Sequence, residues 1–201
     1  YLLGSVPASN MSYAPIDVIL SFCFNSLYVY SARSTKKLSY LIKHDYQMPS
    51  SKMTEEPDIN NLFSIALLKK LIAVKLIGFK IDAAATKNRG QALEKKVIEL
   101  LGYTANESDQ LFGAYPDIKN QLLEVKVQDS PTVDLGKYSP EKQEIVIEQY
   151  GLTTYDVRYL IALTNPKTEI IEGIIISPGE QLGELFSYVS LESYKCQRTI
   201  P

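Results

Sequence analysis

Two acids and a lysine stand close together in the middle of the chain, in an order that suits a metal site. Tyr115-Pro116-Asp117 is followed, a few residues later, by Glu124-Val125-Lys126. Carboxylate oxygens are ligands that Mg²⁺ prefers, and a nearby ammonium group stabilises charge on a phosphate. A divalent metal with an activated water is the chemistry that hydrolyses a phosphodiester. We therefore predict a nuclease with Asp117, Glu124 and Lys126 in its active site.

Other copies of the same short pattern occur in the chain, and secondary structure separates them. Asp/Glu-x-Lys also occurs at 94–96 and 117–119, and 57–58 is a second Pro-Asp pair. Residues two apart share a face on a strand but point apart on a helix. The copy at 94–96 lies in a predicted helix, and the copy at 117–119 straddles a predicted turn. Only Glu124 and Lys126, in a predicted strand, are expected to face the same way.

A predicted hairpin brings the first acid to the second. Residues 111–117 and 122–127 are two strand-like runs joined by a turn at Lys119-Asn120. On the second run, Glu124 and Lys126 should project to one face. The other face should pack with Leu123, Val125 and Val127. This arrangement would place Asp117 beside Glu124.

We include Glu94 and Gln128 among the candidate catalytic residues. Helical spacing aligns Glu94 with the apolar stripe of its helix, where a carboxylate is costly unless it meets a cation or a metal. The alternative is a glutamate that extends to solvent. Gln128 continues the face of Glu124 and Lys126 and could bind a water or phosphate. The alternative for Gln128 is an exposed glutamine at the end of a strand.

Composition limits the classes of function. The 201 residues suffice for one sizeable core, and the net charge of −2 argues against a strongly basic protein that coats nucleic acid. A sequence-specific DNA enzyme remains compatible, because its basic residues cluster on one face. His44 is the sole histidine, which excludes a multi-histidine zinc site. A Ser-His-Asp triad would need His44, but the polar stretch around it contains no nucleophile elbow.

Cysteine usage and hydropathy indicate a cytoplasmic protein. Cys23 and Cys196 are far apart, with neither a disulfide framework nor metal-ligand spacing, as expected in a reducing compartment. The apolar run 18–30 is interrupted by Asn25 and is too short to span a bilayer. Since no basic segment precedes this run, no signal peptide is predicted.

The order of predicted elements indicates an α/β fold with a mixed sheet flanked by helices. Residues 1–58 form a predicted helical N-terminal region, which could bind DNA or mediate dimerisation, with a helical segment over 15–47 and a loop over 47–58. Residues 59–201 form the predicted catalytic domain. Its expected helices begin at Asn60 or Asn61, Arg89, Ser139 and Pro178, and end near residues 79, 101, 149 and 189. Beyond the hairpin we expect a loop over 130–138 and strands over 157–164 and 169–177.

At these residues the chain resembles the PD-(D/E)xK nuclease superfamily, and within it the type II restriction endonucleases. The resemblance covers roughly residues 89–177 and implies a restriction-endonuclease-like core of order α-β-β-β-α-β. The stretch 124–136 is more similar to restriction enzymes than to resolvases. One departure is that the first core strand, expected between Gly102 and Asp117, is short or unclear. The region before residue 59 carries no motif of the family.

The resemblance implies roles for the named residues. Asp117 and Glu124 would hold Mg²⁺, with the main-chain carbonyl of Val125 as a further ligand, and Lys126 would orient the attacking water and help to deprotonate it. The implied activity is that of a type II site-specific deoxyribonuclease. A homodimer would cut double-stranded DNA in the bacterial cytoplasm and leave 5′-phosphate ends. Nearness in sequence alone suggests as DNA-binding candidates Asn88, Arg89, Ser130, Thr132, Lys137, Tyr138 and Lys142.

Two other functions remain open at the level of sequence. One is a structure-specific nuclease, such as a junction resolvase or a repair enzyme. The other is a non-catalytic DNA-binding or interaction domain in which the acids and the lysine form structural ion pairs.

Overall fold

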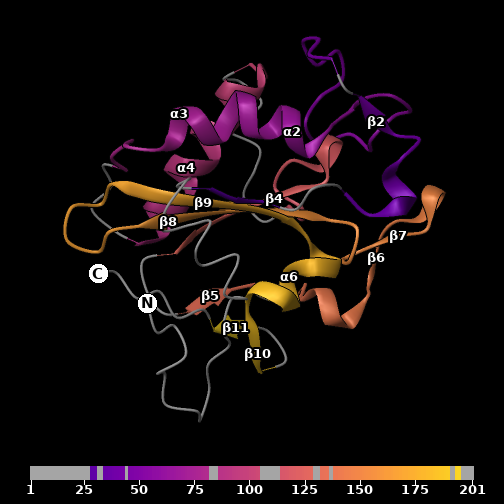
Figure 1. Ribbon diagram of the computed structural model, residues 1–201. Coiled ribbons are helices and arrows are strands. Elements are labelled where there is room, and N and C mark those ends of the chain that lie inside the picture. The colour runs from indigo at the N-terminus through magenta and orange to yellow at the C-terminus, as the bar shows by residue number, and fades with distance from the viewer. Residues whose placement is uncertain are drawn as a thin grey trace.

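A mixed four-stranded sheet forms the centre of the molecule (Figure 1). The computed structural model describes residues 28–30, 34–43, 45–81, 86–104, 114–128, 132–135, 138–190 and 193–195. The strand order is β1-β9-β8-β4, with β1 at Tyr28–Tyr30, β4 at Leu123–Gln128, β8 at Arg158–Thr164 and β9 at Ile171–Pro178. β8 runs parallel to β4 and antiparallel to β9, and β1 runs parallel to β9. The predicted α/β class is therefore confirmed, as are the two strands that flank the turn at 165–167.

Helices cover one face of this sheet (Figure 1). α2 (Ile65–Leu68), the π-helical turn η2 (Lys69–Ala73) and α3 (Val74–Leu76) follow one another without a break, and α4 spans Thr86–Leu101. The first helix begins later than predicted because Ser64, rather than Asn60 or Asn61, caps it by accepting from the Leu67 N–H at 3.2 Å. α4 ends as predicted at Gly102, whose φ of +93° suits glycine. The helices and the sheet share the largest apolar core, which includes Leu68, Ile72, Leu93, Val97, Leu123, Val125, Leu160 and Ile174.

The opposite face carries a small second sheet and one helix (Figure 1). β5 (Thr132–Asp134), β10 (Ser187–Ser190) and β11 (Ser193–Lys195) form an antiparallel sheet of order β10-β11-β5, and α6 spans Gly179–Leu185. A second apolar core fills the space between them and the central sheet and includes Val133, Leu135, Tyr159, Ile161, Leu182 and Phe186.

Short elements close the end of the sheet at which β4 and β8 begin. β2 (Ile42–Lys43) pairs with β3 (Leu62–Phe63), and β6 (Ile145–Ile147) pairs with β7 (Leu152–Thr153). The 3-10 turns are η1 (Lys36–Leu38), η3 (Lys119–Gln121), η4 (Pro140–Lys142) and η5 (Glu148–Tyr150). A third apolar cluster joins these elements and consists of Leu38, Leu41, Leu62, Leu122, Ile147 and Leu152.

The predicted helical character of the N-terminal region is wrong for the part that the structure describes. Residues 28–30 form β1, residues 36–38 form one 3-10 turn and residues 42–43 form β2. The aromatic and β-branched run Tyr28-Val29-Tyr30 suits a strand, and it pairs with Ile174–Ile176 of β9. Residues 15–27 of the predicted helix lie outside the described residues. The predicted loop over 47–58 is confirmed.

The predicted helix over 139–149 is also wrong. Its start signal at Ser139-Pro140-Glu141 produces only the single turn η4, which ends at Gln143 with a φ of +48°. The β-branched run Ile145-Val146-Ile147 then forms β6, because it pairs with β7 across η5. Two boundaries shift as well: β5 lies within the predicted loop 130–138, and the last helix ends at Leu185, before β10.

The predicted hairpin is reduced to a tight turn. Residues 114–117 are not a strand, and 111–113 lie outside the described residues. What remains is one antiparallel bridge, in which Ile118 and Leu123 exchange main-chain hydrogen bonds of 3.0 and 3.2 Å. Leu122 has a φ of +43°, which reverses the chain between η3 and β4.

Both sides of the predicted domain boundary at 58/59 contribute to the same layers. β1 pairs with β9, and Leu38 and Leu41 pack with Leu122. The division into two domains stays a prediction. None of the described helices is long and apolar enough to cross a membrane.

Candidate active site

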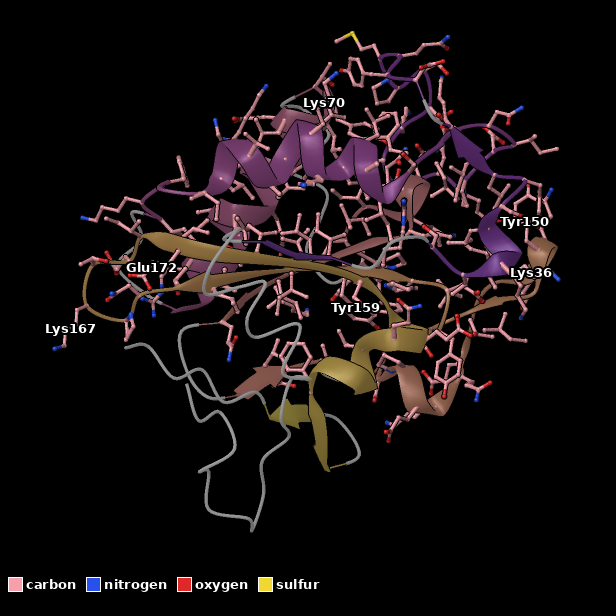
Figure 2. All side chains as sticks on the ribbon, viewed as in Figure 1. Lys36, Lys70, Tyr150, Tyr159, Lys167 and Glu172 are labelled. Atoms are coloured by element: carbon pink, nitrogen blue, oxygen red, sulfur yellow. The ribbon has the colours of Figure 1, made fainter. Side chains whose placement is uncertain are left out.

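The pleat of β4 separates its polar side chains from its apolar ones. Glu124 is in register with Tyr159 and Lys126 with Ile161, so these side chains share the face of the second core. Figure 2 shows Tyr159 below the sheet, on the side away from Lys70 and the α2 helix. Leu123 and Val125 belong to the first core, and Val127 packs against it. The alternation predicted for this strand is therefore confirmed.

Asp117 meets β4 through hydrogen bonds in both directions. The Asp117 N–H donates to Glu124 Oε2 at 3.1 Å, and the Val125 N–H donates to Asp117 Oδ2 at 2.8 Å. Lys126 Nζ lies 2.5 Å from Glu124 Oε1. The structure thus brings Asp117, Glu124 and Lys126 together, as the sequence predicts, although a tight turn does this instead of a two-stranded hairpin.

A buried polar network fixes the turn that carries Asp117. Gln121 is fully buried; its Oε1 accepts from the Phe63 N–H at 2.9 Å and its Nε2 donates to the Asn61 carbonyl at 3.0 Å. The neighbouring Asn120 accepts from the Tyr103 hydroxyl at 2.7 Å. Because each of these buried polar groups has a partner, the turn has a single well-defined conformation.

Arg158, at the start of β8, joins the same network. Its fully buried guanidinium donates to the main-chain carbonyls of Phe63 and Gln121. Burial lowers the pKa of Arg158 to about 9, which still leaves the group charged at neutral pH. A planar group with several donors can hold two carbonyls of different segments at once. Arg158 therefore ties β3 to the turn before β4.

The surroundings of Asp117 oppose its ionisation. The residue is 8% exposed. Burial, followed by the charges of Glu124 and Glu94, raises the pKa of Asp117 to about 8, against the opposing effects of Lys126 and the Val125 N–H. Two further acids close to a buried carboxyl concentrate negative charge at the site, and a bound cation would relieve the repulsion among the three carboxylates.

Lys126 keeps its proton. Burial acts to lower the pKa of Lys126, but the attraction of Glu124, Asp117 and Glu94 together outweighs burial, so that the pKa is raised. A lysine with a raised pKa is a poor proton acceptor at neutral pH. Its contribution to a reaction would be the positive charge that it presents.

Glu94 approaches the site from α4, on the other side of the sheet. Since β4 ends the described strand order, a side chain from α4 can reach round its open edge. Burial raises the pKa of Glu94, Lys126 opposes this effect and Glu124 adds to it. The charges of Lys126 and Glu124 are thus close enough to act on it. The side chain of Glu94 is half-buried and so only partly open to solvent, and its part in the site stays a prediction.

Gln128 lies at the end of β4 and is only 2% exposed, so it is not an exposed strand-end glutamine. Its main-chain carbonyl accepts from the Thr164 hydroxyl at 3.1 Å. Its proposed contact with water or phosphate stays a prediction.

Of three tyrosines beside the site, Tyr138 was a DNA-binding candidate by its nearness in sequence, whereas Tyr115 and Tyr159 were not predicted as site residues. The rings of Tyr115 and Tyr138 stack with centroids 4.3 Å apart, and the Tyr115 and Tyr159 hydroxyls lie 2.7 Å apart. Burial raises the pKa of Tyr115, with Tyr159, Glu124 and Asp117 adding to the effect. The only sequence signal was that Tyr115 precedes Pro116-Asp117. The cluster anchors the segment that enters the site.

The DNA-binding candidates are spread over the molecule. Arg89 pairs with Glu169 at 3.4 Å, near the β8–β9 connection, and Lys142 is exposed on η4. Ser130 and Lys137 lie outside the described residues. Of the other three, Tyr138 stacks on Tyr115, and the side chains of Asn88 and Thr132 lie outside the described part.

The oxygen atoms at the site suit Mg²⁺. No group of three or more His, Cys, Asp and Glu side chains within the described ranges is arranged to hold a metal. Mg²⁺ requires fewer than three such side chains, because it keeps several waters and binds through one or two carboxylates. The N–H and C=O groups of one strand residue point to the same edge of the strand. Since the Val125 N–H points to Asp117, the Val125 carbonyl points to the same edge of β4.

Comparison with protein-family models, with curated proteins and with solved structures finds no match for this chain.

Proposed function

We propose that the chain is a Mg²⁺-dependent endonuclease that hydrolyses double-stranded DNA and leaves 5′-phosphate ends. The proposal includes a restriction-endonuclease-like fold and the sequence specificity of a type II restriction enzyme. Its main support is the convergence of Asp117, Glu124 and Lys126, residues that sequence pattern alone had grouped.

In this proposal Asp117, Glu124 and the Val125 carbonyl hold the metal. A bound Mg²⁺ would neutralise developing charge on the phosphate and assist the leaving oxygen. The donor set contains oxygen only, which is the chemistry that Mg²⁺ prefers. The crowding of Asp117 against Glu124 and Glu94, which raises the pKa of Asp117, also favours a cation at this place.

The raised pKa values assign different roles to Lys126 and Glu94. Protonated Lys126 presents positive charge to a phosphate oxygen, which is an electrostatic role rather than that of a base. Glu94 is the better proton acceptor for the attacking water, because burial raises its pKa and so makes its carboxylate a stronger base. Glu124 holds the Lys126 ammonium at 2.5 Å and so positions it.

Plasmid cleavage in the presence of Mg²⁺ tests the proposal. We expect discrete DNA fragments, which EDTA abolishes. Asp117→Asn and Lys126→Ala should each lower the cleavage rate about a thousandfold, since each removes transition-state stabilisation. Gel analysis of a time course gives the rates.

The chain supplies matched controls for both variants. Asp58→Asn changes the exposed acid of the second Pro-Asp pair, and Lys119→Ala changes the lysine beside Asp117, whose ammonium pairs with Glu56 at 3.1 Å. Both controls should cut at the wild-type rate. Cleavage of branched or damaged DNA alone would favour a structure-specific nuclease. No cleavage of any DNA, with folding intact, would leave the acids and lysine as structural ion pairs.

The homodimer and the bacterial cytoplasm belong to the same proposal. A dimer with two-fold symmetry acts on a symmetric DNA site, so that each protomer cuts one strand. Sedimentation analysis with and without a cleavable duplex would give the mass of the assembly.

A further inference from the structure

A cleft with both polar and apolar lining lies where the segment after β1 approaches the start of α6. Its volume is about 580 Å³, and its polar lining comes from Ser34, Thr35, Lys36, Ser39, Glu180 and Gln181. Figure 2 marks Lys36 at the right of the view, on η1. We refer to this site as the Lys36 cleft. It shares no residue with the candidate active site.

The inner wall of the Lys36 cleft is held in place. Ser34 and Thr35 are 7% and 8% exposed. The Thr35 hydroxyl donates to Asp156 Oδ1 at 2.7 Å, and Asp156 Oδ2 accepts from the Thr153 N–H at 2.9 Å. These bonds fix the wall to the turn between β7 and β8, so that the cleft is formed before any ligand arrives.

The Ser34 hydroxyl is a buried polar group in this wall. Ser34 Oγ has no hydrogen bond to any residue that the structure describes. A buried hydroxyl without a partner destabilises the folded state, and such atoms call for a bound group that satisfies them. An oxygen atom of a ligand in the Lys36 cleft could accept from it.

The rim of the cleft carries opposite charges on its two sides. Lys36 is exposed on η1, whereas Glu180 and Gln181 belong to α6. A complementary ligand has an anionic group at one end and hydrogen-bond donors at the other. Ser34 and Ser39 belong to the same segment as Lys36, and their hydroxyl groups can donate to the oxygen atoms of a phosphate.

We propose that the Lys36 cleft binds a nucleotide. Its phosphate would lie at Lys36, Ser34 and Ser39, and its sugar or base would donate to Glu180 and Gln181. The volume suits a ligand of this size. The choice of a nucleotide among phosphorylated small molecules rests on the proposed function, because a DNA nuclease meets nucleotides in its substrate and product. The location rests on the cleft alone.

Calorimetric titration of the full chain in EDTA tests the proposal, with three probes: thymidine 5′-monophosphate, thymidine and inorganic phosphate. We expect saturable binding of the monophosphate, and at least tenfold weaker binding of the other two, because each lacks one half of the ligand. Equal binding of thymidine would overturn the role of the phosphate. Equal binding of inorganic phosphate would overturn the identification of the ligand as a nucleotide.

Variants locate the bound nucleotide. Lys36→Ala should weaken binding at least tenfold, whereas Lys37→Ala, whose ammonium donates to the Gly151 carbonyl at 3.2 Å, should not. Ser34→Ala should also weaken binding but leave the thermal midpoint of the free protein unchanged or higher, because the unpaired hydroxyl is removed. Equal effects of the two lysine variants, or the absence of saturable binding, would overturn the proposal.

Failure of this inference can be told apart from failure of the proposed function. Asp117→Asn and Lys126→Ala should bind the monophosphate as the wild type does. If they abolish binding while Lys36→Ala retains it, the nucleotide lies at the acidic site, and only the Lys36 cleft is refuted. If binding follows Lys36 but no DNA is cut, only the nuclease activity is refuted.

Discussion

The carboxyl group of Asp117 lies in surroundings that favour its protonated form. It is buried, it faces Glu124 and Glu94, and it still accepts from the Val125 N–H at 2.8 Å. The ionised form of this side chain therefore lowers folding stability, which is a feature often found at active sites. The loss of folding stability arises only when the Asp117 carboxyl ionises, and so this loss depends on pH.

The sign of this dependence follows from the two pKa values of Asp117. The folded value of about 8 exceeds the ordinary value of 3.8. Stability is therefore greatest when Asp117 is protonated in both states, and it is lost as pH rises from about 4 through about 8. We expect Asp117→Asn to raise the free energy of unfolding by about 1 to 3 kcal/mol at pH 8 and by less at pH 5. Urea unfolding in EDTA at both pH values measures the difference.

Asp58→Asn serves as the control for this stability measurement, because Asp58 lies on the surface. It should change the free energy of unfolding little, and equally at both pH values. A variant at 117 that is less stable than the wild type at pH 8 would contradict the prediction.

At the scale of elements, the turn between η3 and β4 decides where Asp117 lies. Gln121 links this turn to β3 and to the loop before it, and Arg158 links it to β8. None of these contacts follows from local sequence, since the partners come from distant parts of the chain. The network thus holds the turn in the position that places Asp117 beside Glu124.

Gln121→Ala tests the network. The substitution leaves the Phe63 N–H and the Asn61 carbonyl without their partner, and we expect a loss of about 2 to 4 kcal/mol in the free energy of unfolding. Thermal or urea unfolding measures the loss, and DNA cleavage should fall as well because Asp117 is less well held.

The matched control is Gln149→Ala, at an exposed glutamine on η5. It should leave both stability and cleavage close to the wild type. If Gln121→Ala costs no more than this control, the network does not hold the turn.

At the scale of the whole molecule, residues before 59 help to complete the layers. β1 pairs with β9, and Leu38 and Leu41 are fully buried in the third apolar cluster. A catalytic domain that begins at residue 59 would lose this strand and these side chains. The division predicted from the sequence can therefore be tested directly.

We expect a chain of residues 59–201 to lack cooperative unfolding, because it exposes apolar surface of β9 and of the third cluster. Circular dichroism during heating would show this, with a chain of residues 28–201, which keeps β1, as the control. A cooperative transition at the temperature of the full chain would instead support an independent catalytic domain.

Local periodicity and residue type were enough to predict several features of the fold and the site. The sequence predicted α4, the strands β8 and β9 with their turn, and the alternation along β4 that places Glu124 and Lys126 on one face. These features follow because burial of one face repeats at 3.6 residues in a helix and at two in a strand. The pairing of Asp117 with Glu124 was predicted as well, from the order of the residues.

Other features depend on partners that are distant in the chain, so they emerge only when the chain is folded. The run 145–147 is a strand because β7 pairs with it, and 28–30 is a strand because β9 pairs with it, although helical signals surround both. Tertiary structure also brought Glu94 close enough for the charges of Lys126 and Glu124 to act on it, placed Tyr115 near the acids and stacked Tyr138 on Tyr115. The charges that raise the pKa of Asp117 come from Glu124 on β4 and Glu94 on α4, so their combined effect exists only in the folded chain.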